Sequence, residues 1–330
     1  MKKTLRIALV FCLTVSLSII LGTGFCGTKK TKIGITAIVS APPLDEAKRG
    51  FFDQLEKMGY NRGNTTFYHS VAEGDMSLCG SIAQSFVQRE VDLIVAVTTP
   101  SAQAAVAAAK GTDIPVLFMA VTAPAKAGLV KSWKNPGMNV TGVSDRMDVY
   151  AQVALIKEFL PNAKRIGTIY NSGEVNSLVQ IKELKKAARK LNYTIIEANV
   201  SASPELIPAA NSLVGRVDAI WVPTDNIISA GLEAVTTVCE DENIPLFGAD
   251  VNQVPRGEIA ALGIRYYDHG VAAGKKAVAI LRGQKKASQI PVTGSKMDLL
   301  WVYPQAAKRM GVTIPQHILD KADKIVTDKF

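Results

Sequence analysis

The sequence predicts an α/β fold of two lobes, each a doubly wound parallel sheet covered by helices, with a cleft between them. Short apolar runs alternate with amphipathic helical stretches along almost the whole chain, which is typical of parallel sheets with helices on both faces. About eleven strand candidates are too many for one sheet of ordinary size. The strand–helix series also starts afresh near 142–148, so we expect two lobes.

The strand candidates are short, apolar and rich in β-branched residues, as buried parallel strands are. They cover 33–39, 66–71, 91–97, 115–119, 140–143, 166–170, 193–200, 218–222, 244–248, 259–264 and 298–302. The helix candidates carry apolar residues at spacings of three and four. They cover 44–58, 77–89, 101–109, 124–131, 148–159, 175–191, 203–214, 227–242, 268–282 and 304–310.

We expect the first lobe to comprise 33–145 with the helix near 267–285, and the second to comprise 146–264 with 288–330. The second strand–helix series parallels the first in order and spacing, without a repeat of its residues. No low-complexity linker separates the two series, so several short crossovers should join the lobes.

The segment 1–26 has the layout of a signal peptide, because three basic residues precede an apolar stretch over 7–21. The stretch is too short for a confident membrane span. Cys26 stands where a lipidated cysteine would stand, although Phe25 occupies a position that usually holds Gly, Ala or Ser. Lipid anchoring through Cys26 and ordinary cleavage near Gly24 are the alternatives, and both predict an extracytoplasmic protein.

The composition argues against several classes of protein. The net charge is +9, but the basic residues are spread over helix faces, so no nucleic-acid partner is expected. The histidines, at His69, His269 and His317, are each far from a second plausible ligand, so no metal site is expected. Without a G-x-S-x-G elbow or a histidine at a strand end, no enzyme activity and no cofactor are expected. Cys79 and Cys239 fall in amphipathic helices and should pack in the cores.

The most informative stretch follows the buried strand 91–97. Thr98, Thr99, Pro100 and Ser101 come directly after it, and a helix begins there. Pro suits a first helical position and Thr or Ser a cap, so free backbone N–H groups and hydroxyls should converge at this strand end. Such a site binds an anion, for example a carboxylate. A capped helix without a ligand is the alternative.

Comparable polar strand ends recur at 122, 145, 171, 225 and 250, and the lobes differ in their chemistry. The first lobe offers hydroxyls and N–H groups at Ser40, Thr98, Thr99, Ser101 and Thr122. The second lobe offers amides and carboxylates at Asn171, Asn176, Asp225, Asn226 and Asp250. The carboxyl ends of both sheets should surround one cleft. The first set would then hold a carboxylate, and Asp225 with Asp250 an ammonium group, so the pattern predicts a receptor for a zwitterion, above all an amino acid.

Asp225 has a second interpretation, since it directly precedes the helix candidate at 227–242 and would cap it. Capping and ligand binding carry equal weight here, and one carboxylate can do both. Asn176 is similarly placed, in the first turn of the helix that follows Asn171.

Five segments occur in a recognisable combination. They are Asn139–Asp145 (NVTGVSD), Tyr170–Ser177 (YNSGEVNS), Trp221–Asn226 (WVPTDN), Thr99–Gln103 (TPSAQ), and Leu44-Asp45 with Gly50 and Gly59-Tyr60. In this combination the chain resembles the ABC-transporter substrate-binding proteins of the tryptophan/phenylalanine-binding type, from about residue 33 to the C-terminus.

The resemblance implies a type I periplasmic-binding (Venus-flytrap) fold with three interlobe crossovers. It also implies delivery of a small solute, an aromatic amino acid in this family, to the permease subunits of an ABC importer. We expect the chain to act as a monomer. Ala41 stands where the family usually has His, and Ala123 where it has Asp, which leaves a non-amino-acid solute as one alternative. A ligand sensor that signals to a membrane receptor is the other.

Overall fold

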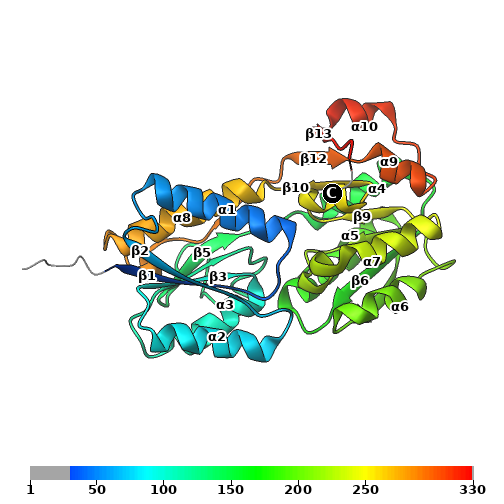
Figure 1. The fold of residues 1–330 in the computed structure, drawn as a ribbon. Coiled ribbons are helices and arrows are strands. Elements are labelled where there is room, and N and C mark those ends of the chain that lie inside the picture. The colour runs from blue at the N-terminus through cyan, green and yellow to red at the C-terminus, as the bar shows by residue number, and fades with distance from the viewer. Residues whose placement is uncertain (1–29, 329–330) are drawn as a thin grey trace, which may run out of the picture.

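The structure is a computed structural model that describes residues 30–328. It contains two sheets, each covered by helices on both faces, which form the two lobes in Figure 1. Two mainly parallel sheets confirm the α/β fold class predicted from the sequence.

The first lobe is built on a six-stranded sheet. Its strands are β1 (Thr31–Ala37), β2 (Thr65–Val71), β3 (Leu93–Val97), β4 (Val116–Met119), β5 (Val140–Ser144) and β11 (Thr293–Gly294), in the order β11-β5-β4-β3-β1-β2. The helices α1 (Pro42–Lys57) and α8 (Tyr266–Leu281) cover one face, and α2 (Met76–Gln88) and α3 (Thr99–Ala108) cover the other (Figure 1). Both β3 and β4 are buried along their whole length, as their continuous apolar runs predict.

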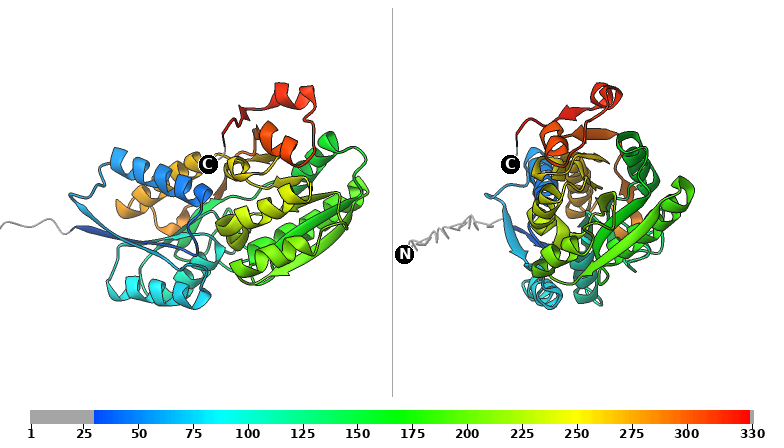
Figure 2. Two further views of the ribbon diagram at one scale, coloured as in Figure 1. Left: turned by 45° about the vertical axis from the view of Figure 1, so that its right-hand side comes forward. Right: turned by 90° about the vertical axis from the view of Figure 1, so that its right-hand side faces the viewer.

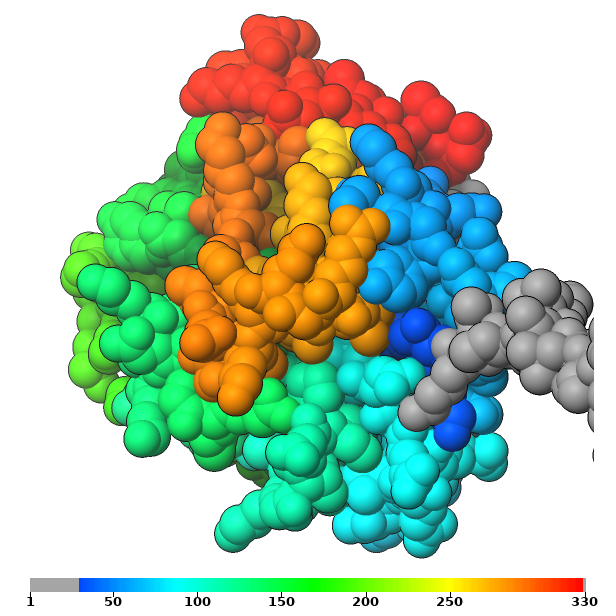
Figure 3. Space-filling view, turned by 90° about the vertical axis from the view of Figure 1, so that its left-hand side faces the viewer, coloured from blue at the N-terminus to red at the C-terminus, as the bar shows by residue number. Residues whose placement is uncertain are grey.

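Two glycines explain why α1 and α8 lie so close together. A Cβ at Gly50 would lie 2.0 Å from the Tyr267 carbonyl oxygen, and one at Gly270 would lie 1.8 Å from the Ala47 carbonyl oxygen. Only glycine permits the two backbones to approach in this way. Figure 3 shows the outer end of this lobe, with the orange end of α8 beside the blue α1.

The second lobe is built on a seven-stranded sheet. Its strands are β6 (Arg165–Asn171), β7 (Thr194–Val200), β8 (Ala219–Val222), β9 (Leu246–Gly248), β10 (Ala260–Gly263), β12 (Leu299–Val302) and β13 (Lys324–Ile325), in the order β13-β12-β10-β9-β8-β6-β7. The helices α4 (Val149–Phe159) and α5 (Val175–Leu191) cover one face, and α6 (Leu206–Asn211) and α7 (Asn226–Asp241) cover the other. The pair β10–β12 is antiparallel. The short helices α9 (Pro304–Arg309) and α10 (Gln316–Lys321) lie at the edge of this lobe (Figure 2).

The chain passes between the two sheets three times. It crosses from β5 into α4, from β10 back into α8, and from β11 into β12. Three crossings are what the family resemblance implies, and no long tether joins the lobes.

One predicted lobe boundary needs correction. The strand β11 pairs in parallel with β5, and the Thr141 hydroxyl donates to the Ile290 carbonyl over 2.7 Å. Val292 packs in the core of the first lobe. The segment from η3 (Ala287–Gln289) to β11 therefore lies on the first sheet, whereas the sequence assigned all of 288–330 to the second lobe. Because β11 has only two residues, periodicity could not detect it.

The helix predicted over 124–131 is absent. This stretch forms one turn, in which the Ala127 N–H donates to the Ala123 carbonyl, and it ends at Gly128 in the left-handed region. The 3-10 helices η1 (Ser203–Glu205) and η2 (Val251–Arg256), the helix α10 and the strand β13 were not separately predicted.

Each lobe has its own hydrophobic core. Cys79 is buried in the first core and Cys239 in the second, both as free cysteines, which confirms their predicted packing role. Within residues 30–328, no helix is long and apolar enough to cross a membrane. The same residues contain no group of three or more His, Cys, Asp or Glu placed to hold a metal ion.

Candidate ligand-binding site

A pocket lies between the lobes, at the carboxyl ends of strands from both sheets. Counted together with its open mouth, the empty space in the pocket is about 340 Å³. The first lobe contributes Pro43, Leu44, Thr98, Thr99, Ala120, Thr122 and Asp145; the second contributes Asn176, Thr224, Asn226, Ser229 and Asp250; Tyr266 lies at the start of α8. Six residues proposed from the sequence are thus brought together here: Thr98, Thr99, Thr122, Asn176, Asn226 and Asp250.

Hydroxyl groups form one wall of the pocket. Thr98 follows β3 in the left-handed region, with φ of 81°, and its side chain does not cap α3. The hydroxyls of Thr98 and Thr99 are buried and have no hydrogen-bond partner within the described part of the chain. Helix α3 begins at Thr99, and the N–H groups of its first turn have no partner within the helix. The wall can therefore receive an anion.

Two carboxylates face the same space. Asp145, which follows β5, is 3% exposed; its Oδ2 accepts a hydrogen bond of 2.9 Å from the Tyr266 hydroxyl, and its Oδ1 has no partner among the described residues. Asp250, which follows β9, is 4% exposed, and its Oδ1 accepts from the Asn252 N–H over 2.9 Å. Among residues 30–328, no Lys, Arg or His lines the pocket.

Burial sets the electrostatics of these two groups. Burial raises the pKa of Asp145. Burial and the nearby charge of Asp145 raise the pKa of Asp250 to about 7, and the charge of Arg256 partly opposes this rise. Behind Asp250, the fully buried Glu258 has a pKa raised well above its usual value, chiefly by burial. Two buried carboxylates without a cation in the pocket favour a positively charged ligand group.

A polar network on the second lobe orients the amides of the pocket. Glu174, 3% exposed, accepts hydrogen bonds from the side-chain amides of Asn176 (2.8 Å) and Asn226 (2.6 Å). Burial and the charge of Asp225 raise the pKa of Glu174 to about 8. With its amide nitrogen held in this way, Asn176 presents a buried Oδ1 that has no partner in the described chain.

Asp225 takes the other role considered for it, the cap of α7. Its Oδ1 accepts from the N–H groups of Ile227 and Ile228, and its Oδ2 accepts from the Asn171 N–H (2.7 Å) and the Ser177 hydroxyl (2.6 Å). The residue is fully buried and does not line the pocket. With both oxygens occupied by protein donors, it is not free to hold a ligand amine.

Three further residues proposed from the sequence do not line the pocket. Ser40 is exposed, and its hydroxyl donates to Asp45 over 3.4 Å. Ser101 is buried against α2, 3.8 Å from the Cys79 sulfur. Asn171 uses its backbone N–H on Asp225 and its side-chain oxygen on the Gly173 N–H. All three were proposed because polar residues follow strands, a pattern that does not say which way a side chain points.

Several pocket residues were missed, and for some the sequence held a signal. Asp145 is a polar strand end, which is such a signal, but the pattern does not single it out as a site residue. Glu174, which holds two pocket amides without lining the pocket, lies in the Tyr170–Ser177 segment and is not singled out either. Thr224 directly precedes the proposed Asp225. No local signal marked Ser229 or Tyr266, which reach the pocket from α7 and α8.

The lobes touch each other across the pocket. The Thr122 and Thr224 hydroxyl oxygens, one from each lobe, lie 3.5 Å apart. The Gln180 amide holds the Thr224 hydroxyl from the other side at 2.5 Å. The two lobes are therefore closed on each other, and each supplies part of the pocket wall.

Comparison with known proteins identifies the family. Residues 32–326 match the family model described as ABC transporter substrate binding protein. The chain belongs to this family. It is therefore a solute-binding component of an ABC transporter, and such components work outside the cytoplasm; the family is not one of enzymes.

Proteins with 35% to 44% sequence identity align with most of this substrate-binding protein. A tyrosine-binding protein of Clostridioides difficile is 44% identical over 266 residues, which is 80% of this chain and 76% of that protein. A conserved domain protein from Vibrio cholerae has 37% identity and a TM-score of 0.88, and a Streptococcus domain in complex with L-Trp has 35% identity and a TM-score of 0.86. Each of the two solved structures covers 90% of this chain and is itself fully covered.

A third solved structure differs in lobe arrangement. The ligand-free, open form of a Clostridium difficile substrate-binding protein is 39% identical over 91% of this chain and is fully covered, yet its TM-score is only 0.67. The L-Trp complex is less identical but more similar in shape. This is the difference that lobe closure would produce, and it agrees with the contact between Thr122 and Thr224.

Proposed function

We propose that this protein binds an aromatic amino acid between its lobes and presents it to the permease subunits of an ABC importer. The observation that carries the amino-acid assignment is the pair of buried carboxylates, Asp145 and Asp250, in a pocket lined by no cationic side chain. An ammonium group between them would neutralise charge that the protein itself leaves uncompensated.

The hydroxyls that line the pocket suit the carboxylate of the same ligand. The unpartnered hydroxyls of Thr98 and Thr99 lie where α3 begins, and hydrogen bonds to a charged group contribute roughly 1.5–3 kcal/mol each. A pocket that offers both unpartnered hydroxyls and buried carboxylates matches the two charges of a zwitterion.

The relatives support the aromatic class, because one is named a tyrosine-binding protein and another was solved with L-Trp. The proposed ammonium site does not depend on the departures at Ala41 and Ala123. Both residues are buried, neither lines the pocket, and the acidic groups that do line it come from positions 145 and 250.

Calorimetry tests the proposal on protein that has been stripped of ligand by unfolding and refolding. L-Tyrosine, L-tryptophan or L-phenylalanine should bind, L-leucine should bind more weakly, and the decarboxylated amine of the best ligand should lose most of the affinity. If none of the amino acids binds, the proposal is overturned and a different solute must be sought.

Uptake experiments in cells distinguish a role in transport from a role in sensing. Deletion of the gene should abolish high-affinity uptake of the labelled amino acid, and permease and ATPase genes should lie beside it. Unchanged uptake would favour the sensor alternative.

We also propose export by a signal peptide over 1–26 and a lipid anchor at Cys26, both of which lie outside the described residues. The proposal rests on the sequence layout and on the extracytoplasmic role of the family. Cys26→Ala should end incorporation of labelled fatty acid and release the protein from membranes. The protein should act as a monomer without catalysis, cofactor or metal, which light scattering and metal analysis can test.

A further inference from the structure

His269 connects the pocket wall to a crossover between the lobes. It lies on α8 and is 1% exposed. Its Nε2 lies 2.8 Å from the backbone nitrogen of Ala120, which lines the pocket, and its Nδ1 lies 2.8 Å from the hydroxyl of Ser295. Ser295 directly follows β11, at the start of the crossover to β12.

These contacts fix the tautomer of the ring. A backbone N–H can only donate, so the Nε2 that faces Ala120 must be unprotonated. The proton of the neutral ring is then on Nδ1, which donates to Ser295. Burial lowers the pKa of His269 to about 3, against a smaller opposing effect of the Val143 carbonyl, so the ring is neutral at physiological pH.

Ala120 needs such an anchor. It has φ of 55°, in the left-handed region that residues with a Cβ rarely adopt. It follows β4 directly and comes two residues before Thr122, which contacts Thr224 of the other lobe. The hydrogen bond to His269 is therefore made at the turn that carries the pocket residues Ala120 and Thr122.

We propose that His269 is a positioning residue, which holds the turn at Ala120 in its binding conformation and ties it to the Ser295 crossover. The effect on affinity rests on the proposed function, whereas the anchoring of the turn does not. In the sequence His269 is an isolated histidine far from a second metal ligand, and its side chain does not line the pocket.

Two variants of His269 distinguish the loss of the hydrogen-bond acceptor from the mere replacement of the imidazole side chain. His269→Leu removes the acceptor, whereas His269→Gln keeps an oxygen that can accept from the Ala120 N–H. His69→Leu, on the exposed face of β2, is the matched control. In ligand-free protein, hydrogen exchange over 117–124 should accelerate in His269→Leu, stay near the parent rate in His269→Gln, and be unchanged in the control.

Affinity for L-tyrosine and L-tryptophan should follow the same order. His269→Leu should bind about ten-fold more weakly, as expected for one buried hydrogen bond, and His269→Gln should restore most of the loss. The effect of His269→Leu should shrink in an Ala120→Gly background, because glycine adopts positive φ without an anchor.

The outcomes are distinct. Unchanged exchange over 117–124 in His269→Leu, or faster exchange with unchanged affinity, would overturn the inference. If His269→Leu does not fold, the ¹⁵N shifts of the parent imidazole decide, since a protonated Nε2 contradicts the anchor and a protonated Nδ1 supports it. If the parent binds no amino acid but exchange responds as expected, the proposed function fails while the anchor at Ala120 stands.

Discussion

Three buried aspartates lie near the ends of strands but differ in what their oxygens contact. Asp225 gives both oxygens to protein donors, whereas Asp145 keeps one oxygen without a partner in the described chain. Asp250 lines the pocket and has one backbone donor. All three aspartates are buried, so it is the occupancy of the carboxylate oxygens that distinguishes the structural role of Asp225 from the binding role proposed for Asp145 and Asp250.

Asp145→Asn and Asp250→Asn should each weaken binding of the amino acid by about ten- to hundred-fold, because each removes a charge from the ammonium site. Both variants should keep the parent's stability or exceed it, since a buried, uncompensated charge is lost. Calorimetry with L-tyrosine and L-tryptophan checks the affinity. Asp53→Asn, an exposed position on α1, is the control and should bind like the parent.

Asp225→Ala should chiefly destabilise the fold, by about 1–3 kcal/mol, because it leaves buried N–H donors at the start of α7 without an acceptor. Urea unfolding measures this loss. A variant of unchanged stability that no longer bound the amino acid would restore Asp225 to the ligand site.

The raised pKa of Asp250, about 7, makes the ligand-free protein sensitive to pH. A carboxyl whose pKa is higher in the folded state stabilises the fold below its ordinary pKa, and this contribution is lost as pH rises through the folded-state value. The free energy of unfolding should therefore fall between about pH 4 and pH 7, by an amount of the order of a few kcal/mol. Asp250→Asn should lose less over the same range.

Ligand affinity should change in the opposite direction. An ammonium group needs the ionised carboxylate, so affinity should rise toward neutral pH and level off above about pH 7. Calorimetry across pH 5–8 would show this rise in the parent, and a flat profile would remove Asp250 from the ammonium site.

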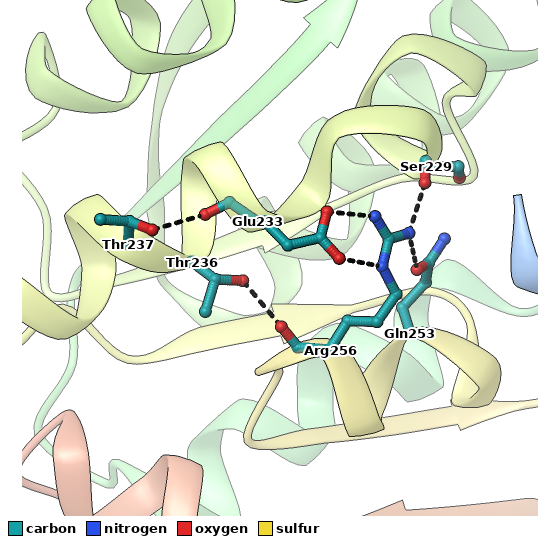
Figure 4. Close-up of polar contacts among 6 residues, drawn as sticks. All are labelled: Ser229, Glu233, Thr236, Thr237, Gln253 and Arg256. Atoms are coloured by element: carbon teal, nitrogen blue, oxygen red, sulfur yellow. Dashed lines mark hydrogen bonds and ion pairs between the residues drawn. The ribbon is translucent and has the colours of Figure 1, made fainter. Parts of the chain in front are cut away.

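At the scale of elements, α7 and η2 form one unit behind the pocket. Helix α7 departs from helical geometry at Gly231, and there Arg256 of η2 donates to the Ser229 carbonyl and pairs through two nitrogens with Glu233 (Figure 4). The Arg256 side chain is 7% exposed and also donates to Gln253 over 2.7 Å. The start of α7 and the start of η2 carry pocket residues, so Arg256 fixes their relative position.

Arg256→Met should destabilise the protein by about 1–3 kcal/mol, because the Ser229 carbonyl and Gln253 lose a buried donor. Arg49→Met removes an exposed ion pair with Glu46 and should cost less than about 1 kcal/mol. Denaturant unfolding of both variants compares them. Equal losses would show that the Arg256 contacts add nothing beyond a surface pair.

At the scale of the molecule, three crossings and a shared pocket make binding a closure equilibrium. Each lobe alone presents only part of the pocket wall, so a ligand stabilises the closed form through contacts that the open form lacks. The radius of gyration from small-angle scattering should fall when L-tyrosine or L-tryptophan saturates the parent. The Asp145→Asn/Asp250→Asn double variant should not compact at the same concentration, and an unchanged radius in the saturated parent would contradict closure.

The sequence by itself determined most of the order of strands and helices, the division into two lobes and the placing of the proposed site at strand ends. These features follow from local periodicity, because an apolar run such as 93–97 is buried in any parallel sheet that contains it. The Thr98–Thr99 wall was predictable for the same reason, since strand, proline and helix start are adjacent along the chain.

Only the tertiary structure decided which strand-end groups face the cleft. Asp145, Asp225 and Asp250 all follow or lie next to strands, and their roles depend on donors from distant segments, such as Tyr266 for Asp145 and Ser177 for Asp225. The same holds for β11, which is too short to show a period, and for His269, whose partners are 149 and 26 residues away. Periodicity reports whether a residue is buried, whereas contacts between residues far apart in sequence decide which atom of a buried side chain remains available to a ligand.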